Sequence, residues 1–167
     1  MEKLSLPDEY LEFLKCLNKH KVNYLIIGAH AIMFHASFAR ASKDMDFWVK
    51  QSEENSQRLA KAVMEFSGSP LSPSTLLIPK QKIEIGNGEF KIELLSYLEA
   101  AHFDEAWEKK ILGNFLGEPA YFVSKDVLIE LKKMAGRSQD ITDLEQLKAS
   151  ETREEEEKKQ NRSELSL

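Results

Sequence analysis

Two alternating segments joined by Asn87 and Gly88 restrict the fold of this chain more than any other local feature. Lys82-Ile-Glu-Ile-Gly86 precedes the Asn-Gly pair, and Glu89-Phe-Lys-Ile-Glu-Leu-Leu95 follows it. Asn-Gly favours a two-residue β-turn, because both central positions of a type I′ turn need a positive φ angle. The sequence therefore predicts two antiparallel strands that meet at this turn.

A strand-glycine-helix-strand unit is predicted before the hairpin. Tyr24 to Ile27 is short, apolar and rich in strand-forming residues, and Gly28 closes it. Ala29 to Ala36 is apolar without alternation, which favours a buried helix packed on that strand. The polar residues 37–43 then lead into a second strand, Asp44 to Val49.

The remaining elements are mainly helical. Apolar residues at helical spacing predict helices up to about His20 and over 53–66, 97–110, 124–135 and 140–147. Residues 117–123 are interpreted as a short strand with an edge-like proline. The predicted class is α+β (α/β), with a mixed β-sheet flanked by helices and a helical C-terminal part.

Length and charge limit the kind of protein this can be. A chain of 167 residues with 42% hydrophobic residues is long enough for one domain with a core. The formal charge of −5 argues against a protein whose whole surface binds nucleic acid. The chain shows neither an export signal nor an apolar stretch long enough to span a membrane, so a cytoplasmic location without a membrane partner is expected.

Residues 151–167 differ in composition from the rest of the chain. They contain six acidic and four basic residues and only two leucines. Such a segment buries too little apolar surface to offset the entropy lost on ordering. We therefore expect one domain over residues 1–150 and a charged tail over 151–167 that is disordered or a frayed helix.

Asp44 and Asp46 are the strongest candidates for a metal site. Residues two apart in a strand share a face, with Cα atoms roughly 6.5–7 Å apart, and carboxylates that close are favourable when a divalent cation lies between them. Glu93 on the second hairpin strand would reach this pair if the two strands are neighbours. Three such carboxylates could hold two Mg²⁺ ions. The alternative is that Glu93 only faces solvent.

Backbone and basic groups near these acids could bind an anion. At Gly28 and Ala29, backbone N–H groups and the positive end of a helix would face a phosphate, and the glycine would allow a close approach. Arg40 and Lys43 could contact phosphates through a planar fork and a point charge, respectively. The alternatives are a plain turn and solvated loop cations.

Charged residues near the C-terminal end of the body form another group. Asp140 and Asp143 are three residues apart and share a helix face, so Asp143 could pair with Lys132 or Arg137. An ordinary surface salt bridge is the alternative.

Four blocks, in this order, resemble the nucleotidyltransferase superfamily. They are Gly28-Ala-His-Ala-Ile, Arg40-Ala-Ser-Lys-Asp44-Met-Asp46, Ile92-Glu-Leu-Leu95 and the segment from Leu128 to Leu144. The resemblance runs from about residue 8 to 147. Within the superfamily, the chain resembles the small bacterial branch that is akin to AbiEii-type toxins and the minimal nucleotidyltransferases. It implies a polymerase-β-like core that transfers a nucleoside monophosphate from an NTP, using Mg²⁺ (or Mn²⁺).

The resemblance also implies roles for particular residues. Asp44, Asp46 and Glu93 would be the catalytic acids and metal ligands. The acceptor would be a hydroxyl of an RNA, tRNA included, or of a partner protein, in a toxin-antitoxin system with a cognate toxin or antitoxin. The implied nucleotide-binding residues are Gly28, Ala29, Arg40, Lys43, Lys132 and Asp143.

Two positions depart from the family pattern. The family usually has Gly-Gly or Gly-Ser where this chain has Gly28 followed by Ala29, and its third acid is usually aspartate instead of Glu93. These departures leave open an alternative function, a catalytically impaired binding protein such as an antitoxin or a regulatory subunit.

Overall fold

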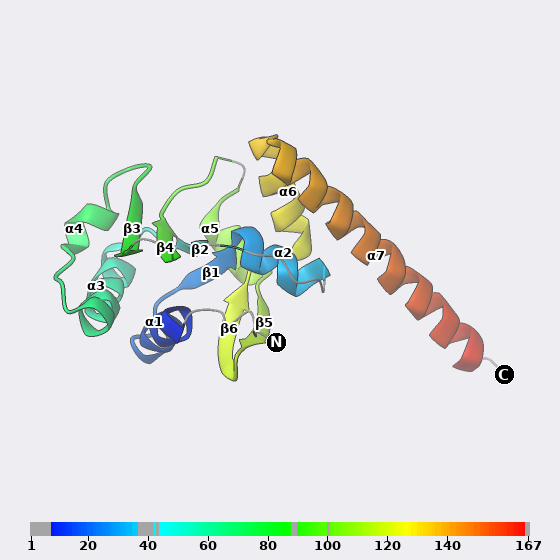
Figure 1. Ribbon diagram of the computed structural model, residues 1–167, viewed down its shortest axis with the longest axis horizontal. Coiled ribbons are helices and arrows are strands. Elements are labelled where there is room, and N and C mark those ends of the chain that lie inside the picture. Colours follow the sequence, from blue (N-terminus) through cyan, green and yellow to red (C-terminus); the bar gives the residue numbers. More distant parts are fainter. Residues whose placement is uncertain (1–7, 37–41, 43, 88–89, 100, 166–167) are drawn as a thin grey trace.

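A six-stranded mixed sheet forms the centre of the computed structural model, which describes residues 8–36, 42, 44–87, 90–99 and 101–165 (Figure 1). Strand β2 is parallel to β4, and β1 is parallel to β6; the other neighbouring strands are antiparallel. The predicted α+β class with a mixed sheet is therefore confirmed. In the spatial order of the sheet, the strands are β3 (Lys82–Asn87), β4 (Phe90–Leu95), β2 (Asp44–Val49), β1 (Tyr24–Ile27), β6 (Glu118–Phe122) and β5 (Ile111–Phe115).

Helices cover both faces of the sheet. The ring of Phe47 on β2 lies 5.4 Å from that of Phe13 on α1, whereas its neighbour Trp48 contacts Phe103 on α5 at 5.3 Å between ring centroids. Successive strand residues point to opposite faces, so these contacts place α1 and α5 on different sides. The helices are α1 (Asp8–Lys19), α2 (Gly28–Ala36), α3 (Glu53–Ser67), α4 (Pro73–Leu76), α5 (Phe103–Glu108), α6 (Lys125–Ala135) and α7 (Ser138–Leu165).

The predicted hairpin is present as β3 and β4. Its antiparallel pairing runs from Lys82 opposite Leu95 to Asn87 opposite Phe90, and residues 88–89 lie outside the described part of the chain. The strand bounds thus differ by one residue from those predicted. Strand β4 also pairs in parallel with β2, which joins the hairpin to the strand-glycine-helix-strand unit.

The predictions between residues 97 and 123 were partly wrong. The helix predicted over 97–110 is only Phe103–Glu108, and the unpredicted strand β5 follows it. Gly113, a weak strand former, is needed inside β5 because a Cβ there would lie 2.7 Å from the Phe34 ring. Pro119 is not on an edge strand, since β6 lies between β1 and β5. It is tolerated because β6 pairs with β1 at its far end, where Phe122 lies opposite Ile26.

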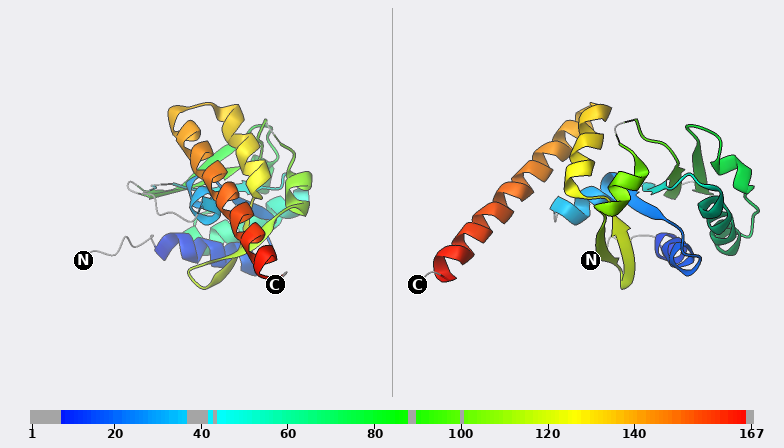
Figure 2. Two further views of the ribbon diagram at one scale, coloured as in Figure 1. Left: turned by 90° about the vertical axis from the view of Figure 1, so that its right-hand side faces the viewer. Right: turned by 180° about the vertical axis from the view of Figure 1, so that it is seen from behind.

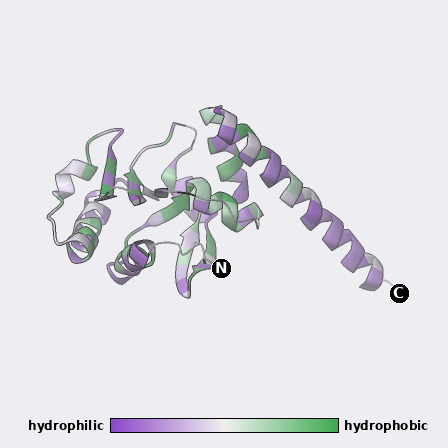
Figure 3. Ribbon diagram, in the orientation of Figure 1, coloured by the Kyte–Doolittle hydropathy of each residue, from purple (hydrophilic) through white to green (hydrophobic). Residues whose placement is uncertain are grey.

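Helix α6 begins and ends as the sequence indicates, whereas α7 begins two residues before the predicted helix and runs on past its predicted end. Ser124 caps α6 by accepting a hydrogen bond from the Val127 backbone N–H, and Gly136 ends it with a φ angle of 64°. Helix α7 continues to Leu165 and includes most of the segment predicted to be a disordered or frayed tail. Its distal part projects from the body (Figure 2) and is mostly hydrophilic (Figure 3). No helix within the described ranges is long and apolar enough to cross a membrane.

Candidate active site

A cleft of about 740 Å³ opens beside the end of β1 and the start of β2. One wall is acidic and comes from the sheet, and the other comes from α6 and the start of α7. The cleft therefore brings together segments that lie far apart in the sequence. Its polar lining is Gly28, Ser42, Asp44, Asp46, Lys82, Glu93, Glu99, Lys132, Arg137, Gln139 and Asp140.

Strand register brings the three predicted acids to one face of the sheet. Asp46 lies directly opposite Glu93 in the parallel pair of β2 and β4, and Asp44 lies two residues before Asp46 on the same strand. Paired residues in neighbouring strands point to the same face, so all three side chains line the cleft. The Glu93 side chain is only 15% exposed. The condition set from the sequence, that the two strands be neighbours, is met.

The Asp46 carboxyl is the most perturbed group in the cleft. Burial, a hydrogen bond with Glu93 and the charges of Glu93 and Asp44 raise the pKa of Asp46 to about 7. Its Oδ1 atom is buried and has no hydrogen-bond partner among the described residues. A buried carboxylate oxygen without a partner is costly unless a cation or a proton compensates it.

The donor set fits a hard divalent cation. Mg²⁺ and Mn²⁺ prefer carboxylate oxygens, which Asp44, Asp46 and Glu93 supply, and the unpartnered Asp46 Oδ1 is available as a ligand. Across the parts of the chain that are described, no three His, Cys, Asp or Glu side chains are already arranged as a metal centre. In the arrangement seen, the Asp46 and Glu93 carboxyls share a hydrogen bond.

Gly28 places the start of α2 directly against Asp46. Its φ angle is +68°, a conformation that strongly favours glycine, and an added Cβ would overlap Asp46 Oδ2 and lie 3.2 Å from Cγ. Gly28 and Ala29 both line the cleft. The glycine is therefore required both by the backbone and by the close approach of the carboxylate.

We expect Gly28→Ala to destabilise the protein by about 1–3 kcal/mol, through backbone strain and displacement of Asp46. It should also weaken Mn²⁺ binding at least about tenfold, because the displaced carboxylate is a predicted ligand. Urea unfolding and equilibrium dialysis with Mn²⁺ would measure the two effects. Gly68→Ala is a matched control, since Gly68 has a φ angle of +72° but open space around its Cβ. A Gly28→Ala variant with unchanged Mn²⁺ affinity would contradict the prediction.

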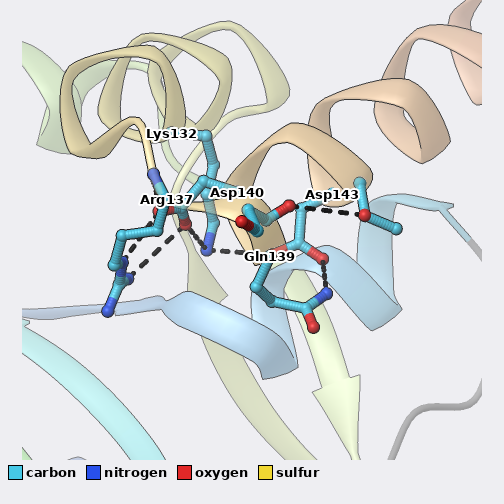
Figure 4. A network of polar contacts seen from close by, with 7 residues as sticks. Lys132, Arg137, Gln139, Asp140 and Asp143 are labelled. Carbon is cyan, nitrogen blue, oxygen red and sulfur yellow. Dashed lines mark hydrogen bonds and ion pairs between the residues drawn. The ribbon is translucent and has the colours of Figure 1, made fainter.

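A buried charge network forms the opposite wall of the cleft (Figure 4). The ammonium of Lys132 lies 3.0 Å from Asp140 Oδ1 and 3.1 Å from Asp143 Oδ2. Arg137 Nε donates to Asp140 Oδ2 at 2.8 Å, and Gln139 donates to Asp143 Oδ1 at 3.1 Å. Asp140 and Asp143 are 0% and 1% exposed. The alternative of an ordinary surface salt bridge is therefore wrong.

Asp140 is held in its charged form by this network. Burial would raise the pKa of Asp140, but hydrogen bonds from Arg137 and Lys132 outweigh burial and lower it to about 2. The folded-state pKa therefore lies below the unfolded value, and the stabilisation is complete above about pH 4 and is lost as the pH falls through about 2.

We expect this stabilisation to appear as an acid-dependent difference between the wild type and Asp140→Asn. The stability gap between them should shrink by about 2 kcal/mol between pH 5 and pH 2, because only the wild type must protonate this carboxylate. Urea unfolding followed by circular dichroism at a series of pH values would measure it. A gap that stays constant over this range would show that Asp140 is not held in the charged form.

Three of the six predicted nucleotide-binding residues line the cleft. Gly28, Ala29 and Lys132 line the cleft, and Asp143 lies behind Lys132, outside the lining. The list of predicted residues also includes Arg40 and Lys43, which lie outside the described residues.

Sequence reasoning missed two residues that shape the acidic wall. Lys82 Nζ lies 3.2 Å from Glu93 Oε1, and the alternation of the hairpin strands could have placed both on one face. Ser42 Oγ donates to the Asp44 carbonyl at 2.8 Å and accepts from the Asp44 N–H at 3.3 Å, which holds the start of β2. No sequence signal distinguishes Ser42 from other loop serines.

The arrangement of the mixed sheet and its helices is shared with solved nucleotidyltransferases, so the resemblance seen in the sequence is confirmed at the level of the fold. The chain is similar to the lincosamide antibiotic adenylyltransferase LnuA in its lincomycin-bound crystal structure, with 14% identity, a TM-score of 0.59, and coverage of 87% of this chain and 98% of that one. It is also similar to ANT(2″)-Ia in complex with adenylyl-2″-tobramycin, with 14% identity, a TM-score of 0.57, and coverage of 86% and 88%.

A third similar structure is an antigenic nucleotidyltransferase-like protein from Paracoccidioides brasiliensis, with 12% identity, a TM-score of 0.53, and coverage of 85% of this chain and 74% of that one. No model of a protein family matches the sequence. No curated protein matches it either. The likeness is thus one of fold, and the activity has to be argued from the cleft.

Proposed function

We propose that this protein is a metal-dependent nucleotidyltransferase that moves a nucleoside monophosphate from an NTP to an acceptor hydroxyl. The observation that carries the proposal is the convergence of Gly28, Asp44, Asp46 and Glu93 on one cleft. A helix that begins at a glycine beside clustered carboxylates suits a metal-bound triphosphate, because it combines backbone donors with oxygen ligands. The fold shared with adenylyltransferases is consistent with this chemistry.

Each residue on the acidic wall has a role in this proposal. Asp44 and Asp46 would hold Mg²⁺ or Mn²⁺, with Glu93 as the third acid. The ion, when bound, would neutralise charge on the phosphates. The N–H groups at Gly28 and Ala29 would bind phosphate oxygens, and Glu93 would accept the proton of the attacking hydroxyl.

The opposite wall would bind the departing pyrophosphate. Arg137 lines the cleft with a side chain that is 76% exposed, so its guanidinium can reach an anion while it also holds Asp140. The charge of the buried Lys132 is already balanced by Asp140 and Asp143. Asp143 would act indirectly, by holding the Lys132 ammonium in place. Arg40 and Lys43, just before the acids in the sequence, would add further phosphate contacts.

For the acceptor, we propose a hydroxyl group of an RNA, tRNA included, or of a partner protein, within a toxin-antitoxin system in the cytoplasm. The charge of −5 gives this chain no general attraction for polyanions, so an RNA acceptor would need a local basic surface. The small-molecule antibiotics named for LnuA and ANT(2″)-Ia belong in the same acceptor screen. A neighbouring reading frame for a cognate toxin or antitoxin would favour the protein acceptor.

Incubation of the purified protein with each labelled NTP, Mg²⁺ and cell extract tests the proposal. The wild type should label an acceptor and release pyrophosphate, and the Asp44→Ala/Asp46→Ala double variant should do neither. Chelation of Mg²⁺ should abolish labelling by the wild type. Equal labelling by the wild type and the double variant would exclude the mechanism.

A catalytically impaired binding protein with the nucleotidyltransferase fold, such as an antitoxin or a regulatory subunit, is the second candidate. The ion pair between Lys82 and Glu93 favours this second candidate, because the carboxylate that would accept the proton of the attacking hydroxyl is already paired with an ammonium. Calorimetry separates the candidates: no measurable Mg²⁺-dependent NTP binding would favour the impaired binding protein, whereas binding without pyrophosphate release would indicate a nucleotide sensor.

A further inference from the structure

Charged side chains share one face of the three strands β2, β4 and β3. Asp46, Glu93 and Glu84 form a row across these strands, since Asp46 lies opposite Glu93 and Glu93 lies opposite Glu84. Lys82 is two residues from Glu84, and Lys91 is two residues from Glu93, so both lysines point to this face. Among the described residues of these three strands, the cations on the face that bears the acids are Lys82 and Lys91.

Only one of these lysines reaches the cleft. Lys82 Nζ lies 3.2 Å from Glu93 Oε1 and 3.6 Å from Glu84 Oε1, and Lys82 lines the cleft together with Asp44 and Asp46. Lys91 Nζ contacts Glu84 Oε2 at 4.0 Å and is not part of the cleft lining. The two side chains are similarly exposed, at 49% and 47%. Location, and not exposure, distinguishes them.

We propose that the Lys82 ammonium acts as a fixed cation at Glu93, so that the acidic cluster binds one divalent ion, at Asp44 and Asp46, instead of two. The inference rests on the proposed function, because it concerns the metal content of the same site. With a divalent ion bound, Asp44, Asp46 and Glu93 would all be ionised and would carry a charge of −3. Lys82 reduces this charge to −2, which a single divalent ion balances. A second divalent ion at Glu93 would be repelled by an ammonium within a few ångströms.

In this arrangement, Lys82 is a positioning residue. The antiparallel pairing of β3 and β4 fixes the backbone position of Lys82. The Glu93 side chain is mostly buried, which limits the positions that the ion pair can take. The Lys82 ammonium would therefore orient Glu93 toward the cleft and leave the carboxylates of Asp44 and Asp46 free to bind the metal ion.

Counting bound Mn²⁺ tests the inference. The electron paramagnetic resonance signal of free Mn²⁺, recorded at one pH during titration of the full chain, gives the number of ions bound per protein. We expect one ion for the wild type and two for Lys82→Met. Lys82→Arg keeps the positive charge and should bind one. Lys91→Met, the matched control, should also bind one.

The outcomes separate this inference from the proposed function. Two ions on the wild type, or one ion on Lys82→Met in a variant with an unchanged thermal melt, would overturn the role of Lys82 and leave the metal site standing. Two ions on Lys82→Arg would show that charge at this position is not the cause, and would overturn the inference as well. No ion on the wild type would contradict the proposed function itself, and the inference with it.

Discussion

Replacing Lys132 with methionine is expected to destabilise the protein by about 3–5 kcal/mol, because it leaves two buried carboxylates without their shared ammonium. Asp140 would keep Arg137 and Asp143 would keep Gln139, but both acids are almost fully buried. Methionine matches the length of the lysine stem, so the loss would be mainly electrostatic. Urea unfolding at pH 7, followed by circular dichroism, would measure the change in the free energy of unfolding.

The neighbouring lysine provides the control. Lys133 lies on the same helix, is 54% exposed, and contacts Glu130 at 3.5 Å. Lys133→Met should change stability by less than about 0.5 kcal/mol, since exposed ion pairs contribute little. If Lys132→Met cost no more than Lys133→Met, the network would not stabilise the junction of α6 and α7.

Replacing Asp46 with asparagine is expected to lower nucleotidyl transfer by about 10³-fold or more while making the metal-free protein more stable at pH 8. The loss of activity follows from removing a predicted metal ligand and its charge. The gain in stability follows from the raised pKa of about 7, which means that the folded state must ionise Asp46 beside Glu93 and Asp44 at this pH.

The sign of the effect follows from proton linkage. A carboxyl whose folded-state pKa is raised binds its proton more tightly in the folded state, so it destabilises the protein as the pH rises from about 4 to above 7. Asparagine removes this cost, and the gain should be about 1–3 kcal/mol at pH 8 and vanish near pH 4. Added Mg²⁺ should stabilise only the wild type, because ligand binding to the folded state shifts the unfolding equilibrium.

Urea unfolding in a chelator at pH 4–9, repeated with Mg²⁺, would measure both effects. Asp126→Asn is a suitable control, since Asp126 is exposed at the start of α6 and lies outside the cleft lining. A lower stability of Asp46→Asn than of the wild type at pH 8 in the chelator would contradict the prediction.

Local patterns predicted well the elements whose conformations depend on near neighbours. The β3–β4 hairpin follows from alternating residues around Asn-Gly, and α6 follows from a capping serine at Ser124 and a left-handed glycine at Gly136. The break at Gly28 between β1 and α2 was also predicted. In each case, the signal lies within a few residues of the structure it determines.

Elements that depend on distant contacts were predicted poorly. Strand β5 contains Gly113, and glycine is a poor strand former. Its presence there is explained only by the Phe34 ring, which leaves no room for a side chain. Pro119 indicated an edge strand, although β5 and β1 flank β6.

The sequence by itself determined which residues could carry the chemistry: two aspartates on one strand face, an alternating Glu93, and a glycine at the entry to a helix. Only the tertiary structure decided that these groups meet, because the pairing of β4 with β2 joins segments more than forty residues apart. It also decided that Lys82 lies against Glu93 and that Lys132 is enclosed by Asp140 and Asp143. Distances and burial set the strength of these charge interactions, and both arise only when the sheet and the helices pack together.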